Sequence, residues 1–243
     1  MKFAESITDF FKSPKWVTNL IFAGLCTLVA SIPVVGIVGV IVLVGWLVTG
    51  FYMRQNDEDF VTFPDFDFGQ LGKYLERGLW PVLTTGAVVI GVGLVLWLVF
   101  FIPVMILSAL LSDSNGVVGG FFALILSLLS LVIYSAIFAV ISLIIVPLSI
   151  RASLVQDFVK AFDINFIKKF ALMMWKEILI ASLFVAVVGA ALSFIGFFAF
   201  CVGMFLAQAL TAFAWTHLSK QIYKLYLSRG GEPVPVSPKL AVV

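Results

Sequence analysis

The stretch "SIPVVG", residues 31–36, lies inside a run of 38 residues, Trp16–Met53, that contains no charged side chain. One membrane-spanning helix needs only about 20 residues, so the run is too long for a single upright span. Pro33 lacks a backbone donor and Gly36 tolerates unusual dihedral angles, which permits a tight turn. These six residues therefore decide whether the chain crosses once or turns back here, and so on which side every later segment lies.

The composition assigns the chain to a class before any motif is considered. Of its 243 residues, 62% are hydrophobic and 12% are charged, whereas soluble domains average roughly 45–50% apolar and 25% charged residues. A polytopic membrane protein is therefore expected. The net charge of +2 gives no support for a nucleic-acid partner. Cys26 and Cys201 both lie in apolar runs, so we expect packing residues rather than a disulfide framework.

The distribution of charge predicts the topology. Four long apolar runs cover residues 16–53, 78–111, 117–150 and 178–216. If the first and last are hairpins, turning at 31–36 and near Ala190–Gly196, the termini and the loops 54–77 and 151–177 share one face. That face then carries all 15 Lys and Arg residues, and the other keeps only Asp113. Because Lys and Arg mark the cytoplasmic side, both termini are predicted to be cytoplasmic, in the cell membrane.

The predicted fold is an all-α transmembrane helical bundle with about six spans, forming one membrane domain over residues 14–226. The spans are expected at 16–31, 35–53, 78–108, 118–150, 178–195 and 197–217. At 1.5 Å per residue the first measures about 24 Å, short of a hydrocarbon core of about 30 Å. The first hairpin therefore either thins the bilayer or is re-entrant and stops part-way. Charge does not separate these alternatives, because both have the same sidedness.

The two ends of the chain are predicted to lie outside this domain. Residues 1–13 form an amphipathic helix, with Phe3, Ala4, Ile7, Phe10 and Phe11 on its apolar face. Its polar face carries Lys2, Glu5, Ser6, Asp9 and Lys12. Such a helix lies in the membrane interface, or it packs on the protein's own cytoplasmic side. Residues 227–243 form a flexible cytoplasmic tail.

Two loop segments resemble each other. "FDFGQLGKYLERGLWPVL" begins at Phe66 and "FDINFIKKFALMMWKEIL" begins at Phe162, with Lys73 and Lys169 at matching places. Because both lie on the same predicted face, an inverted repeat in register is excluded. Either a local motif is used twice, or the chain retains a trace of duplication.

Few residues offer chemistry. His217 is the only histidine, and the sequence contains none of the common catalytic or phosphate-loop signatures. The predicted spans carry no ionisable group well inside the membrane, which argues against proton-coupled transport. We therefore expect neither an enzyme nor a cofactor.

The most distinctive charged feature is an acidic cluster in the loop after the first hairpin. It comprises Asp57, Glu58, Asp59, Asp65 and Asp67. Carboxylates in this number can contact a divalent cation or a basic partner. They lack the spacing of a known calcium loop, and a solvated loop with helix-capping aspartates is the favoured interpretation.

The polar groups inside the spans are mainly hydroxyls, joined by Gln208. They include Thr27, Thr49, Thr84, Thr85, Ser127, Ser130, Ser135, Ser142, Ser182 and Ser193. Together with span glycines such as Gly86, Gly91 and Gly93, they suit close helix packing. The leading hypothesis is a non-enzymatic membrane module in contact with lipid that assembles with itself or with a protein partner. The alternative is a channel or carrier for a small neutral solute, or a lipid-handling protein.

The order of these segments resembles a known family. An amphipathic start leads into an apolar hairpin with a central Ile-Pro and a glycine, followed by "GFYMRQ", an acidic stretch and "FPDFDFGQLGKYLERGLW". This pattern is similar to that of the bacterial and archaeal integral membrane proteins grouped as the domain-of-unknown-function 4013 family. The resemblance extends from about Phe3 to Tyr226 and is sharpest over Gly50–Gly78. It implies a polytopic helical membrane protein and brings no established activity.

Overall fold

The computed structural model describes residues 1–53, 59–98, 105, 117–199 and 202–237, and every regular element within these ranges is helical. The helices are α1 (Glu5–Thr8), α2 (Trp16–Ala30), α3 (Gly36–Tyr52), α4 (Leu71–Leu96), α6 (Val117–Val155), α7 (Phe158–Ala161), α8 (Ile164–Phe198) and α9 (Val202–Ser228). Short 3₁₀ helices are η1 (Asp9–Lys12), η2 (Phe60–Thr62) and η3 (Phe68–Gln70). The predicted all-α class is confirmed.

Among the described residues, three helical segments are long and apolar enough to cross a membrane. They are Phe68–Leu96, Leu124–Val155 and Phe158–Phe198, with 29, 32 and 41 residues. Two shorter apolar helices, α2 and α3, precede them. The chain is therefore a helical membrane protein.

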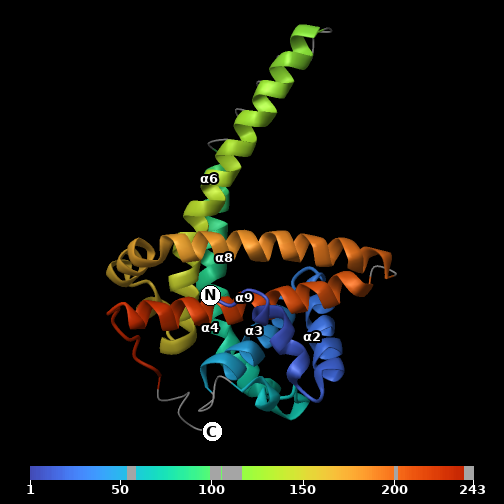
Figure 1. Cartoon of the computed structure of the whole chain (residues 1–243), viewed down its shortest axis with the longest axis vertical. Coiled ribbons are helices and arrows are strands. Elements are labelled where there is room, and N and C mark those ends of the chain that lie inside the picture. The colour runs from blue at the N-terminus through green and yellow to red at the C-terminus, as the bar shows by residue number, and fades with distance from the viewer. Residues whose placement is uncertain (54–58, 99–104, 106–116, 200–201, 238–243) are drawn as a thin grey trace.

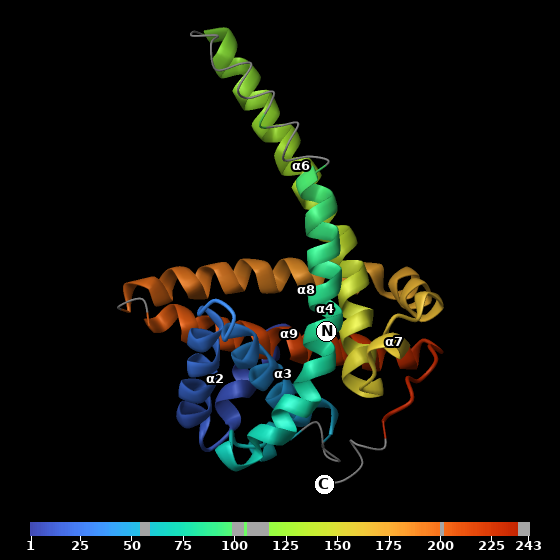
Figure 2. The same cartoon turned by 180° about the vertical axis from the view of Figure 1, so that it is seen from behind.

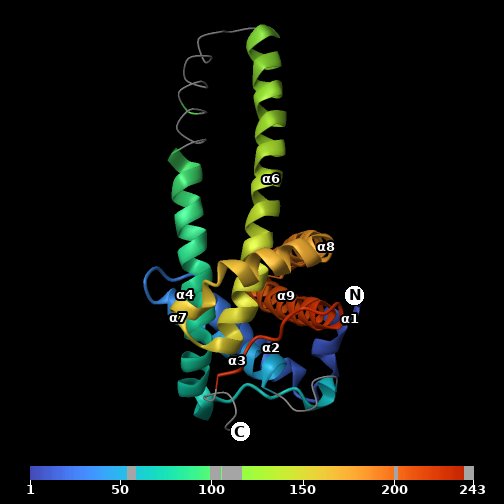
Figure 3. The same ribbon diagram turned by 90° about the vertical axis from the view of Figure 1, so that its left-hand side faces the viewer.

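The long helices do not share one direction. The helices α4 and α6 stand side by side and antiparallel, and they project well beyond the rest of the molecule (Figures 1 and 3). The helices α8 and α9 also run side by side, but they lie crosswise to the α4–α6 pair in all three overall views, including the view from behind (Figure 2). The α2–α3 hairpin packs beneath α9, so the body is built where the two pairs cross.

The predicted turn at residues 31–36 is confirmed. The helix α2 ends at Ala30 and α3 begins at Gly36, and the amide of Gly36 donates a hydrogen bond to the carbonyl of Ile32 at 2.8 Å. Within the turn Val34 has a φ of 68°, a left-handed conformation that is costly for a β-branched residue. A Cβ atom on Gly36 would overlap the carbonyl oxygen of Ala30. The glycine therefore allows the two helices to approach closely directly after the turn.

The second hairpin turns later than predicted. Residues Ala190–Gly196 are helical, because α8 continues to Phe198, and the reversal lies between α8 and α9. The backbone leaves the helical region at Ala199 (φ −89°, ψ 57°). Gly196 instead faces Gly203 on α9, where a Cβ atom would overlap the backbone of the partner glycine. Gly196, at the end of the predicted turn, thus allows close packing of the two helices.

The N-terminal segment packs against the protein itself. It consists of α1 and η1 rather than one continuous helix, and two of its polar residues, Ser6 and Asp9, are buried. The ring of Phe10 meets that of Phe213 on α9 at 5.1 Å, and Phe3 meets Phe184 on α8 at 5.0 Å. These contacts support the alternative of packing on the protein's own surface. Burial of the segment in a membrane interface stays a prediction.

The two similar loop segments have a common structural role. Asp67 accepts a hydrogen bond from the amide of Gly69 at 2.8 Å, and Asp163 accepts one from the amide of Phe166 at 3.1 Å. Each Phe-Asp pair therefore starts a helix, α4 through η3 in the first case and α8 in the second. The helices consequently extend into the stretches 54–77 and 151–177, which were expected to be loops.

Candidate functional site

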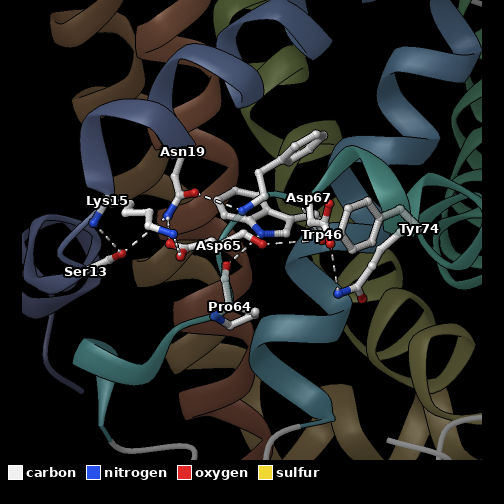
Figure 4. Close-up of polar contacts among 10 residues, drawn as sticks. Ser13, Lys15, Asn19, Trp46, Pro64, Asp65, Asp67 and Tyr74 are labelled. Atoms are coloured by element: carbon white, nitrogen blue, oxygen red, sulfur yellow. Dashed lines mark hydrogen bonds and ion pairs between the residues drawn. The ribbon is translucent and has the colours of Figure 1, made fainter.

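The acidic loop is tied to the first hairpin by a polar network (Figure 4). Lys15 pairs with Asp65 at 3.0 Å, and the amide nitrogen of the Asn19 side chain donates to Asp65 at 3.3 Å. The oxygen of the same Asn19 side chain accepts from the amide of Phe66 at 2.9 Å. From α3, the indole nitrogen of Trp46 donates a hydrogen bond to the carbonyl of Pro64 at 3.0 Å. The loop is therefore a fixed part of the body.

The predicted contact residues of the acidic cluster have structural partners where they are described. Asp59 accepts from the amide of Val61 at 3.0 Å, Asp67 caps η3 as described above, and Asp65 joins the network of Figure 4. Asp57 and Glu58 lie outside the described residues. Among the residues that are described, no group of three His, Cys, Asp or Glu side chains could hold a metal ion. A contact of this cluster with a cation or a basic partner stays a prediction.

His217 lies in an aromatic cluster beneath the same loop. Its ring packs 4.8 Å from that of Phe60 and 5.5 Å from that of Phe51. Its Nε2 atom lies 3.7 Å from the buried carboxylate of Asp9, which also pairs with Lys12 at 2.7 Å. The hydrogen bond that Lys12 donates to the Asp9 carboxylate raises the pKa of Lys12 above its usual value. The histidine thus joins the N-terminal segment to α9, which is a structural role.

Two apolar pockets lie on either side of Trp215. The larger, here the α8 pocket, measures about 550 Å³ and is bounded by α6, α8 and α9. The smaller, here the α4 pocket, measures about 360 Å³ and is bounded by α3, α4, α6 and α9. Trp215 and Ile145 line both, so these two side chains stand between the pockets. Both volumes fall in the range of small-molecule sites, about 300–1,000 Å³.

Most hydroxyls that line the pockets bond to their own helix. In the α8 pocket Ser142 donates to the carbonyl of Phe138 at 2.8 Å. In the α4 pocket Ser149 donates to the carbonyl of Val146 at 3.0 Å. This pattern is common for serines in apolar helices, and it occupies the single donor of each hydroxyl.

Two of the other lining hydroxyls, one in each pocket, are buried without a partner in the described part of the chain. Ser182 in the α8 pocket and Ser219 in the α4 pocket are only 2% and 4% exposed, and neither hydroxyl has a hydrogen-bond partner among the described residues. An unsatisfied buried hydroxyl costs about 1–3 kcal/mol. A molecule that places an acceptor or donor beside Ser182 or Ser219 recovers part of that cost. The sequence pointed to Ser182 but not to Ser219, and no sequence signal distinguishes either from its bonded neighbours.

Comparison with known proteins gives one match. The model of a family described as "Protein of unknown function (DUF4013)" matches residues 15–214. Searches of curated proteins and of solved structures found no match.

Proposed function

We propose a function for this chain, which belongs to the DUF4013 family of proteins of unknown function because the family match covers most of its length. The chain is a non-enzymatic membrane protein that binds an apolar or amphiphilic molecule in the pockets beside Trp215. A membrane lipid is the natural ligand of this chemistry, since the pockets belong to a chain with three segments apolar enough to span a bilayer. The observation that carries the proposal is the pair of buried, unpartnered hydroxyls, Ser182 and Ser219, one in each apolar pocket.

The lining explains why the ligand is expected to be mostly apolar. The side chains around Ser182 include Ile141, Val185 and Trp215, and those around Ser219 include Val44, Val48 and Val89. Sites of this kind bind through apolar area and use a few polar groups to orient the ligand. A lipid ester or alcohol group has the hydrogen-bonding capacity that one serine hydroxyl requires.

The test is to fill the α8 pocket. Ala186 lines it, whereas Ala191, one and a half turns further along the same helix, is exposed and does not. We expect Ala186→Phe to lose lipid that co-purifies with the full-length protein, measured by native mass spectrometry, and Ala191→Phe to retain it. Equal lipid content in both variants, with both folded, would overturn the proposal.

Assembly with a second copy is a second candidate function, supported by one observation on α4. A Cβ atom added to Gly91 or Gly93 would meet no atom of the described residues within 4 Å, so these glycines serve no helix contact within the described part of the chain. Small residues on an open helix face permit close approach of another membrane helix. We expect Gly93→Leu to reduce the oligomer mass in detergent relative to Ala87→Leu, an exposed position on the same helix. Unchanged mass in both variants would exclude this face.

A further inference from the structure

A polar cavity lies away from the pockets beside Trp215. It measures about 440 Å³ and is formed where the end of α6, the start of α8 and the chain after α9 meet. Its charged side chains are Arg151, Asp163, Lys169 and Glu232. Cationic side chains that share one cavity can bind an anion together. Whether an anion binds here depends on which carboxylates already pair with Arg151 and Lys169.

Arg151 is held rigidly at this cavity. Its Nε donates to the carbonyl of Lys160 at 2.8 Å, its terminal nitrogen pairs with Asp163 at 2.8 Å, and its guanidinium lies over the ring of Phe166 at 5.1 Å. The side chain is 15% exposed. A guanidinium fixed in this way loses little freedom when it binds an anion.

Lys169 is paired with a carboxylate from the end of the chain. Its Nζ lies 2.6 Å from Glu232, and both side chains are largely open to solvent. Exposed ion pairs contribute little to stability, so this one is readily exchanged for another anion. Arg151 and Asp163, by contrast, come from helices that are fixed by the fold.

The segment that supplies Glu232 is fastened across the cavity as a strap, residues 232–237. Gly230 has a φ of 83°, which turns the chain back after α9. Beyond it the amide of Val234 donates to the hydroxyl of Tyr223 at 2.9 Å, and the amide of Ser237 donates to the carbonyl of Leu154 at 2.8 Å. Val234 itself is buried. These bonds hold the strap across the charged cavity, and the flexibility expected for the tail 227–243 stays a prediction.

We propose that this cavity binds a phosphate group and that Glu232 fills the site as an internal substitute. With Glu232 in place the two cations are balanced by two carboxylates. When Glu232 withdraws, Arg151 and Lys169 outweigh Asp163 by one charge and present donors suited to phosphate oxygens. The phosphate belongs to a lipid headgroup or to a soluble molecule, and this site is independent of the proposed lipid pockets.

The test compares full-length variants in detergent. Glu232→Gln removes the substitute carboxylate, and Glu5→Gln is its matched control, because Glu5 forms an exposed pair with Lys2 at 3.0 Å on another part of the surface. The probes are inorganic phosphate, followed by calorimetry, and phosphatidylglycerol against phosphatidylcholine, followed by native mass spectrometry. We expect Glu232→Gln to bind a phosphate probe about two- to fivefold more tightly than wild type, the gain that an exposed ion pair allows.

The outcomes distinguish a soluble phosphate from a lipid headgroup, and they also test the proposal itself. A gain with inorganic phosphate identifies a site open to soluble phosphates, and a gain with phosphatidylglycerol alone identifies a lipid headgroup site. In either case adding Lys169→Gln should reverse the gain. Equal affinities in Glu232→Gln and Glu5→Gln would overturn the proposal, as would a gain that survives Lys169→Gln.

Discussion

His217 on α9 lies 3.7 Å from the carboxylate of Asp9 at the start of η1, and both side chains are almost fully buried. The first residues of the chain are thereby joined to its last helix. Phe10 adds an edge-to-face ring contact with Phe213 beside this pair. The N-terminal segment is therefore part of the folded body rather than an appendage.

Removal of the Asp9 carboxylate should destabilise the protein. Asp9→Ala removes the buried carboxylate that pairs with Lys12 and lies beside His217, and disrupting a buried polar group of this kind costs about 0.5–3 kcal/mol. The measurement is thermal unfolding of the purified protein in detergent. The exposed pair of Glu5 with Lys2 provides the control, since Glu5→Ala should lower the midpoint far less. Equal losses would show that the buried pair contributes nothing particular.

The unpartnered pocket hydroxyls should favour ligand binding and not the stability of the fold. Ser182→Ala breaks no hydrogen bond of the described structure and removes an unsatisfied buried hydroxyl, so we expect the free energy of unfolding to stay unchanged or to rise by up to about 3 kcal/mol. Co-purified lipid should nevertheless decrease. Ser142→Ala is the matched control because Ser142 lines the same pocket with its hydroxyl already bonded to Phe138. If both variants keep the same lipid, the hydroxyl of Ser182 does not orient a ligand.

Close packing of the first hairpin predicts opposite effects at two glycines. A Cβ atom at Gly39 would overlap the carbonyl oxygen of Cys26, whereas one at Gly72 on α4 meets no atom of the described residues within 4 Å. We expect Gly39→Ala to destabilise the protein by about 1–3 kcal/mol through overpacking. Gly72→Ala should be neutral or stabilising by up to about 1 kcal/mol, because alanine is the better helix former. Denaturation of both variants under one condition compares their free energies of unfolding directly. If Gly39→Ala were as stable as the wild type, the close contact between Gly39 and the backbone of Cys26 would be contradicted.

Sidedness can be tested with single cysteines in a cysteine-free background. Gln156, near the start of the predicted cytoplasmic loop 151–177, is buried and donates a hydrogen bond to the carbonyl of Arg77 at 3.1 Å, so it is a poor labelling site. Val159 is 79% exposed and serves instead. We expect a cysteine at Val159 to be protected from an impermeant reagent in intact cells, and one at Asn115, which lies outside the described residues, to be labelled. Reversed labelling would refute the predicted topology.

Much of the fold follows from the sequence because it depends on local properties. The length of the apolar runs predicts membrane helices, and Pro33 with Gly36 predicts the first turn. The same local logic applies to the aspartates: Asp67 and Asp163 each cap the helix that follows them, which the pattern allowed but did not single out. The acidic cluster drew attention as a contact site, yet the fold uses its described members to hold the loop.

The sequence predicts an all-helical membrane protein with a hairpin at Pro33. Only the tertiary structure shows that α8 and α9 run crosswise to α4 and α6. Hydropathy indicates how long a helix is and contains no information on its direction relative to the other helices. Direction comes from contacts between distant residues, such as Gly196 with Gly203 and Gly78 with the backbone of Ile41. The pockets beside Trp215 exist only where these helices cross. Whether a buried serine keeps its own helix carbonyl, as Ser142 does, or faces a pocket unpartnered, as Ser182 does, is likewise set by the packing around it.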